Sequence, residues 1–354
     1  MPVHALIVGC AGTTLTPDEI ALFRDLDPWG LILFRRNCDN PDQIRHLTET
    51  FRGIGGRADA PVLVDQEGGR VQRLGPPHWP KYPAARAFSR IAANDPLVGR
   101  EMARLGARLI ANDLRSVGIT VDCLPVLDVP VPGSHTIIGD RAYGEGPDMV
   151  AAFGRAAAEG LIAGGVLPVI KHIPGHGRAA ADSHDALPVV DADRASLEAT
   201  DFKPFRTLTD MPLAMTAHVV YSAIDARRPA TTSRKVMREV IRGAIGYDGL
   251  VMTDDLSMNA LAGSLGERTR ASFRAGCDMV LHCNGKIPEM LAVAAETPVL
   301  AGKARRRAEA ALGRIRHESE PLDVAEARAR FFEVLERTSL APSTGFAPTH
   351  ALSV

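Results

Sequence analysis

The fold class is decided by the stretch Val166-Leu167-Pro168-Val169-Ile170-Lys171-His172-Ile173-Pro174-Gly175-His176-Gly177. Its first five residues form a short apolar run, which is typical of a buried strand. The polar residues that follow surround a Pro-Gly turn that cannot be helical. Polar groups crowded at the carboxyl end of a buried strand are typical of the sites of α/β proteins. The stretch therefore predicts a strand that ends in a site for chemistry or ligand contact, and not a polar surface loop with chance histidines.

Short apolar runs of this kind recur at roughly regular intervals along the chain, at 5–8, 30–34, 61–64, 120–127, 166–170, 213–216, 250–253 and 278–282. Most of them are separated by segments with helical periodicity, several with a capping residue and a first-turn proline, at 17–26, 41–54, 96–117, 148–163 and 234–245. Alternating strands and helices predict parallel pairing. Eight such units favour an α/β fold with a single closed (β/α)8 barrel of the TIM type over an open, doubly wound sheet.

The domain organisation predicted from composition is simple. No linker divides the chain before residue 340, so we expect one catalytic barrel domain over 1–340, including two C-terminal helices within 303–340. The run Arg305-Arg306-Arg307 indicates a solvated helical face. The segment 341–354 is expected to be an irregular tail.

Composition narrows the classes of partner and compartment. The chain has 354 residues, 45% of them hydrophobic, and a formal net charge of -1, so it can bury a large core but lacks the basic field that nucleic-acid binding needs. Its five cysteines have no CxxC spacing and indicate free thiols in a reducing compartment. No stretch has the pattern of an export signal or the length of a membrane span. We expect a soluble cytoplasmic monomer that acts on a small molecule without a membrane partner.

Charged residues follow two further strands. Asp65, Glu67, Arg70 and Arg73 surround Gly68-Gly69, where glycine permits close backbone approach. This pattern fits an internal ion-pair cluster and a hydroxyl-binding site equally well. Arg141 follows a later run and could fork onto a ligand carbonyl or onto a neighbouring carboxylate.

Two other motifs carry the residue types of acid/base and nucleophilic chemistry. Asp182 and His184 lie two apart, and a carboxylate bonded to one ring nitrogen would fix the tautomer and raise the basicity of the other; a capping Asp beside a surface His fits the spacing equally well. Asp254 and Asp255 end an apolar run, and adjacent residues of an extended chain point to opposite sides. One functional aspartate is therefore expected there, and periodicity does not say which.

The remaining notable side chains have ordinary structural explanations. His218 and His282 also end strands, and we interpret both as satisfied scaffold histidines. His78 and Trp79 lie in a loop where an aromatic side chain could cover a pocket or pack into the core.

Taken together, these motifs resemble family 3 of the glycoside hydrolases, and within it the single-domain bacterial β-N-acetylhexosaminidases of peptidoglycan recycling. The resemblance runs from Leu6 to about Leu340. Its specific elements, in this order along the chain, are 30–37, 65–73, 171–177, 182–184 and 253–258. The family's usual phenylalanine in the Lys-His-Phe-Pro motif is Ile173 here, a conservative apolar exchange.

The resemblance implies roles for individual residues. It makes Asp254 the nucleophile of a retaining mechanism, His184 the acid/base, and Asp182 its orienting partner. The residues that it implies hold the sugar hydroxyls and the N-acetyl group are Asp65, Arg73, Arg141, Lys171 and His172. His176 matches a loop histidine that would shape its loop, in which Gly175 and Gly177 could be hinges. No metal or other cofactor is implied, and the substrate would be a muropeptide fragment such as GlcNAc-1,6-anhydroMurNAc, with or without peptide.

Three other functions are compatible with parts of this pattern. A metal-dependent TIM-barrel hydrolase could use His172, His176 and His184 with Asp254, although Pro174-Gly175 prevents the helix that the i, i+4 spacing would need. Bound metal or loss of activity on chelation would identify it. A glycoside phosphorylase of the same family is conceivable, because a histidine acid/base does not repel phosphate as a carboxylate would. A non-catalytic sugar-binding barrel would fail to turn over a chromogenic glycoside.

Overall fold

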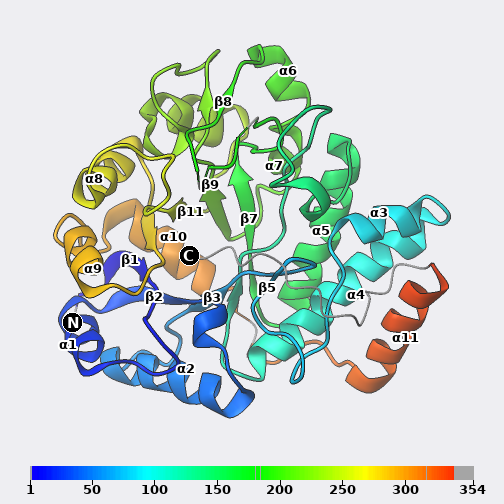
Figure 1. The fold of residues 1–354 in the computed structure, drawn as a ribbon, viewed down its shortest axis with the longest axis horizontal. Coiled ribbons are helices and arrows are strands. Elements are labelled where there is room, and N and C mark those ends of the chain that lie inside the picture. The colour runs from blue at the N-terminus through cyan, green and yellow to red at the C-terminus, as the bar shows by residue number, and fades with distance from the viewer. Residues whose placement is uncertain (1, 180, 184, 316, 339–354) are drawn as a thin grey trace.

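The computed structural model describes residues 2–338 apart from 180, 184 and 316, and its core is a closed barrel of parallel strands (Figure 1). Around the barrel the strand order is β1-β12-β11-β9-β7-β6-β3-β2, with all neighbouring pairs parallel. The strands span His4–Val8 (β1), Pro28–Leu33 (β2), Val62–Val64 (β3), Val121–Asp122 (β6), Leu167–Ile173 (β7), Leu213–Thr216 (β9), Leu250–Asp255 (β11) and Met279–His282 (β12). Each predicted apolar run overlaps one of these strands, so the (β/α)8 barrel is confirmed and the open sheet is excluded.

Helices surround the barrel, and Figure 1 shows α11 packed on the outside of α4. They are α1 (Pro17–Leu26), α2 (Pro41–Gly55), α3 (Arg86–Ala92), α4 (Pro96–Arg115), α5 (Pro147–Ala163), α6 (Arg194–Ala199), α7 (Lys203–Thr207), a π-helix (Val236–Ala244), α8 (Leu265–Ala275), α9 (Ile287–Ala294), α10 (Gly302–Leu312) and α11 (Val324–Arg337). Prolines open α1, α2 and α4 as the sequence predicts, and Pro147 opens α5 one residue before its predicted start. No helix in this described part of the chain combines the length and the apolar character needed to cross a membrane.

Several smaller elements lie in the segments that follow the carboxyl ends of the barrel strands. β4 (Gln66–Gly68) and β5 (Val71–Gln72) form a hairpin directly after β3, and β8 (Val189–Val190) pairs with β10 (Val220–Tyr221). Single 3-10 turns occupy Arg35–Asn37, Gly139–Arg141 and Ala230–Thr232. The hairpin and the turn at 139–141 carry side chains of the pocket described below.

Side chains at alternate positions of a strand point either into the barrel interior or toward the surrounding helices. Ala5 and Ile7 of β1 belong to the interior cluster, whereas Leu6 and Val8 pack in the cluster beneath the helices. The same alternation places Leu167 and Val169 of β7 inside the barrel, and Leu250 and Met252 of β11 as well. Farther along the strands, at their carboxyl ends, the inward-facing side chains are polar, and the pocket lies there.

Helix α10 closes the other end of the barrel. Its Ala308 and Ala311 belong to the interior cluster, and the segment before it bonds to the start of β1, where Leu300 N–H donates to Val3 O at 2.7 Å. Arg307 pairs with Asp278 at 2.9 Å and also with Asp248, so it is half-buried. The expectation of a fully solvated basic face is therefore wrong at Arg307, because the helix turns that side chain toward carboxylates at the starts of β11 and β12.

One strand boundary differs from the prediction in a way that matters for the site. β7 continues through Lys171 and His172 to Ile173, whereas the sequence predicts its end at Ile170. A lysine and a histidine can lie in a buried strand only if their polar atoms find partners. Both do, as shown below. The predicted tail, 341–354, lies outside the described residues.

Candidate active site

A pocket opens at the carboxyl ends of the barrel strands, and its floor is the last layer of interior side chains, including Ile32, Phe34, Met215 and Leu281. Its walls contain most of the residues that the sequence singles out as site candidates: Asp65, Arg73, Arg141, Lys171, His172, His176 and Asp254. These side chains come from segments far apart in the sequence. The barrel brings them together because parallel strands all end at the same face.

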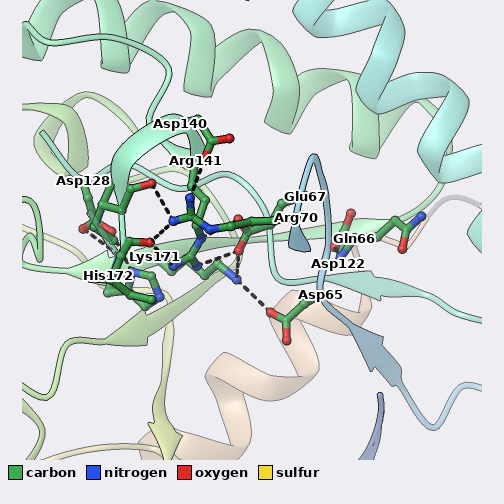
Figure 2. Close-up of polar contacts among 12 residues, drawn as sticks. Asp65, Gln66, Glu67, Arg70, Asp122, Asp128, Asp140, Arg141, Lys171 and His172 are labelled. Atoms are coloured by element: carbon green, nitrogen blue, oxygen red, sulfur yellow. Dashed lines mark hydrogen bonds and ion pairs between the residues drawn. The ribbon is translucent and has the colours of Figure 1, made fainter. Parts of the chain in front are cut away.

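The charged residues of the pocket form one connected cluster (Figure 2). The Lys171 ammonium donates to Asp65 Oδ1 at 2.8 Å and lies 2.7 Å from Glu67 Oε1. Arg141 forks onto Glu67 with two bonds of 2.8 Å, from Nε and one terminal nitrogen. Arg73 lies 3.3 Å from the other oxygen of Asp65. Thus Arg141 meets a neighbouring carboxylate, and the segment 64–73 contributes to an internal ion-pair cluster that also lines the pocket.

Burial and pairing together determine the charge states in this cluster. Burial alone raises the pKa of Glu67, but Arg141 and Lys171 outweigh it and lower that pKa to about 2. The pKa of Asp65 lies still further below its usual range for the same reason, with Lys171 and Arg73 as the cations. Burial opposes charge on Lys171, yet Asp65 and Glu67 raise its pKa above the usual range. All three groups are therefore ionised at neutral pH, and the pocket presents fixed charges to a ligand.

Asp128 organises the histidines of the pocket, and the sequence did not single it out. Its buried carboxylate accepts from the His172 backbone N–H at 3.2 Å, from His172 Nδ1–H at 2.7 Å and from the His176 backbone N–H at 2.7 Å. Burial opposes its ionisation, but the two histidines lower its pKa to about 2. Because Asp128 occupies Nδ1 of His172, Nε2 is the nitrogen left for a ligand. The one sequence signal was a carboxylate at the end of the apolar run 120–127.

His176 is buried with a ring that resists protonation. Burial and the neighbouring His172 lower its pKa from 6.5 to about 4. The unfolded chain therefore binds a proton that the folded chain rejects as the pH falls from 6.5 toward 4. Across this window we expect His176 to lower the free energy of unfolding by up to about 1.4 kcal/mol per pH unit. His218 and His282 also have lowered pKa values and add to the effect with the same sign.

Urea unfolding of the wild type and of His176→Gln across this pH range would measure the contribution. The free energy of unfolding of the wild type should fall on acidification. For the variant it should fall less steeply, by up to about 1.4 kcal/mol per pH unit, which corresponds to one proton. Equal slopes for the two proteins would contradict the neutral, buried state of His176.

Adjacent aspartates at the end of β11 have different surroundings. The Asp255 carboxylate accepts from the backbone N–H of Ser257 at 3.1 Å and from that of Cys283 at 3.2 Å, and from the Ser257 hydroxyl. It therefore ties the end of β11 to the end of β12. Asp254 is more exposed to the pocket, continues the inward series of Leu250 and Met252, and accepts from the Asp255 backbone N–H at 2.8 Å. A bulge between Met252 and Asp255 lets both side chains reach the pocket wall.

The segment with the predicted acid/base pair is described in part. Asp182 is buried, and its carbonyl oxygen accepts from the N–H groups of Asp185 and Ala186, so it opens a tight turn. His184 lies outside the described residues. The loop that leads there is closely packed at its base: a Cβ on Gly177 would lie 2.1 Å from the carbonyl oxygen of Val129. Glycine at 177 is thus required for close approach of two backbones, which is a different reason from the expected hinge.

The side chains with structural explanations divide as follows. His218 is satisfied as predicted, with Nδ1 2.7 Å from the Thr231 hydroxyl and Nε2 3.0 Å from the Asp255 carbonyl oxygen. His282 is buried and neither ring nitrogen makes a hydrogen bond, but Nε2 lies 3.4 Å from Glu289 Oε2 and Nδ1 lies 3.9 Å from Asp255 Oδ1, so its neighbours are carboxylates. Trp79 packs in the main hydrophobic cluster and is not part of the pocket lining. Among the described residues, no group of three or more His, Cys, Asp or Glu side chains is arranged to hold a metal ion.

Comparison with known proteins places this barrel and pocket in a family. Residues 19–316 match the model of the glycosyl hydrolase family 3 N-terminal domain. A β-hexosaminidase of Alkalilimnicola ehrlichii is 41% identical over 288 residues, which cover 80% of this chain and 82% of that protein.

Solved structures agree. NagZ of Neisseria gonorrhoeae, in complex with N-trifluoroacetyl-D-glucosamine, superposes with a TM-score of 0.84 at 31% identity, covering 97% of this chain and 99% of that one. A family 3 β-N-acetylglucosaminidase of Paenibacillus sp. is 30% identical with a TM-score of 0.72, and covers 98% of this chain and 63% of that one. By its motifs, its fold and these relatives, the chain belongs to glycosyl hydrolase family 3.

Proposed function

We propose that this glycoside hydrolase, a β-N-acetylhexosaminidase, removes terminal β-linked N-acetylglucosamine from peptidoglycan fragments such as GlcNAc-1,6-anhydroMurNAc, with or without peptide. The observation that carries the proposal is the pocket itself. One carboxylate, Asp254, faces a cluster of fixed charges at the end of a barrel whose relatives are hexosaminidases. The five cysteines are all free and buried, which supports action in the reducing cytoplasm.

The nucleophile in this proposal is Asp254. A retaining glycosidase needs a carboxylate that reaches the anomeric carbon and leaves again when water attacks. The Asp255 carboxylate is already used to join the ends of β11 and β12, so moving it would break several hydrogen bonds. Asp254 continues the inward face of β11 into the pocket, where it can bond the anomeric carbon as the bond to the aglycone oxygen breaks.

The acid/base in this proposal is His184, oriented by Asp182. In the first step a protonated imidazole donates its proton to the leaving oxygen, and in the second step the neutral imidazole accepts a proton from the attacking water. Most glycosidases use a second carboxylate for this task. The carboxylate displaces the aglycone with inversion, and water then displaces the carboxylate from the opposite face with a second inversion, so the product keeps its β configuration.

The sugar-binding residues in this proposal are the fixed charges of the pocket. The carboxylates of Asp65 and Glu67 are paired with the side chains of Arg73, Arg141 and Lys171. Sugar hydroxyls would therefore form hydrogen bonds with ionised groups. His172 presents Nε2 to a ligand because its Nδ1–H donates a hydrogen bond to Asp128 Oδ2. Arg141, Lys171 and His172 are the groups that we expect to bind the glucosamine ring and its acetamido group.

Discrimination for the acetamido group tests the substrate proposal. If donors or acceptors of the pocket lose their partner, each unpaired buried group costs about 1–3 kcal/mol, so kcat/KM should fall about 5- to 150-fold when hydroxyl replaces acetamido. The measurement compares nitrophenyl β-N-acetylglucosaminide with nitrophenyl β-glucoside. Equal hydrolysis of both would make the substrate proposal wrong, even if the fold and the nucleophile stand. The NagZ relative binds an N-acylated glucosamine, which supports the expected preference.

A further inference from the structure

Ser183 lies inside the acid/base motif and connects it to two other parts of the site. It is 4% exposed and lines the pocket. Its hydroxyl oxygen is 3.2 Å from Nε2 of His176, and its carbonyl oxygen accepts from the Ala260 N–H at 3.1 Å. One residue thus ties the motif both to the loop after β7 and to the segment after β11.

The partner of the Ser183 hydroxyl is held in place from behind. The His176 backbone N–H donates to Asp128 Oδ1 at 2.7 Å, and the same carboxylate holds His172. His176 stays neutral above a pH of about 4, because burial and His172 lower its pKa. Its Nδ1 is buried without a hydrogen-bond partner. An orphaned N–H is rarer than an orphaned acceptor, so the proton belongs on Nε2, which donates to the Ser183 oxygen.

The second connection leads to the strand of the nucleophile. Ala260 lies in the turn that follows β11, where Met258 N–H donates to the Asp255 carbonyl oxygen at 3.2 Å and Leu261 N–H to the Met258 carbonyl oxygen at 3.2 Å. The Asp255 side chain fixes the start of this turn to β12. The hydrogen bond from the Ala260 N–H therefore attaches Ser183 to the backbone segment that directly follows β11, the strand that carries Asp254.

We propose that Ser183 is a positioning residue for the glycosidase reaction: its hydrogen bonds to His176 and Ala260 fix the acid/base segment relative to the nucleophile. This inference depends on the proposed function, in which the next residue along the chain, His184, is the acid/base. A general acid must lie within about 2.6–3.2 Å of the oxygen that it protonates. A misplacement of about 1 Å can lower a rate by the order of 10²-fold.

The experiment measures how kcat/KM depends on the leaving group, with aryl β-N-acetylglucosaminides whose phenols span a range of pKa values. For Ser183→Ala we expect kcat/KM to fall about 10- to 100-fold with the most basic phenols and little with dinitrophenol, which needs no protonation. Ser183→Thr keeps the hydroxyl and should restore the wild-type dependence. A merely structural role would lower kcat/KM equally for all leaving groups.

Ser272→Ala is the matched control, because Ser272 is also buried and its hydroxyl donates to the Arg268 carbonyl oxygen at 2.9 Å, away from the pocket. It should reduce stability without changing the leaving-group dependence. If Ser183→Ala does not fold, His176→Leu removes the same hydrogen bond from its other side and should steepen the dependence in the same way. A folded Ser183→Ala or His176→Leu protein with the wild-type dependence overturns the inference.

Failure of this inference can be distinguished from failure of the proposed function. If His184→Ala steepens the leaving-group dependence but Ser183→Ala does not, His184 is still the acid and only the role of Ser183 is wrong. If His184→Ala leaves the dependence unchanged, the acid/base proposal itself is wrong. The role of Ser183 in general acid catalysis is then overturned with it.

Discussion

Replacing Asp254 by asparagine should abolish turnover while leaving the fold intact. The amide is nearly isosteric with the carboxylate but cannot form the covalent intermediate, so kcat should fall on the order of 10⁴–10⁶-fold, as for nucleophiles of other covalent enzymes. Asp254 is partly exposed, and the amide oxygen of an asparagine can still accept the hydrogen bond that the Asp255 N–H donates to Asp254 Oδ1. The measurement is kcat with an aryl β-N-acetylglucosaminide, together with thermal unfolding of the same protein.

The neighbouring residue provides the control. Asp255→Asn weakens the bonds that join β11 to β12, so it should lower the unfolding temperature more than Asp254→Asn does. Its folded fraction should still turn over substrate. The reverse ranking, with an inactive but stable Asp255→Asn and an active Asp254→Asn, would move the nucleophile to Asp255.

The second large effect is expected at His184. General acid/base catalysis contributes about 10²–10⁴-fold, so His184→Ala should be slower by that factor with substrates whose leaving groups are poor. With dinitrophenyl substrates the kcat/KM of the variant should approach that of the wild type, because a good leaving group departs without a proton. An external nucleophile such as azide should speed the second step in the variant, since it needs no general base. Equal losses across all leaving groups would show that His184 has only a structural role.

The barrel could be predicted from the sequence because its strands are short, apolar and evenly spaced, and strand ends concentrate the polar residues. Alternation puts Asp254 on the same face of its strand as Leu250 and Met252, but it could not tell that this face is the inner one, which the packing of Leu250 and Met252 inside the barrel shows. What alternation could not do was count through the bulge between Met252 and Asp255, which brings both aspartates to the pocket wall. Only the partners of Asp255 separate the two.

Other features depend on contacts between distant segments and left weaker signals in the sequence. Asp128 is recognisable only once β6 and β7 are neighbours, because its importance comes from His172 and His176 more than 40 residues later. The extension of β7 through Lys171 was unexpected because a lysine inside a buried strand is favourable only when Asp65 and Glu67 are opposite. The helices α6 and α7 are too short to show a hydrophobic period.

The central claim is that Asp254 forms a covalent glycosyl-enzyme, and trapping that intermediate tests it most directly. A 5-fluoro-N-acetylglucosaminyl fluoride keeps the acetamido group, forms the intermediate and slows its hydrolysis, so the intact protein should gain the mass of one fluorosugar. Peptide mapping should place that sugar on Asp254, and Asp254→Asn should not be labelled. A sugar attached to any other residue, or turnover with inversion and no labelled protein, would contradict the account.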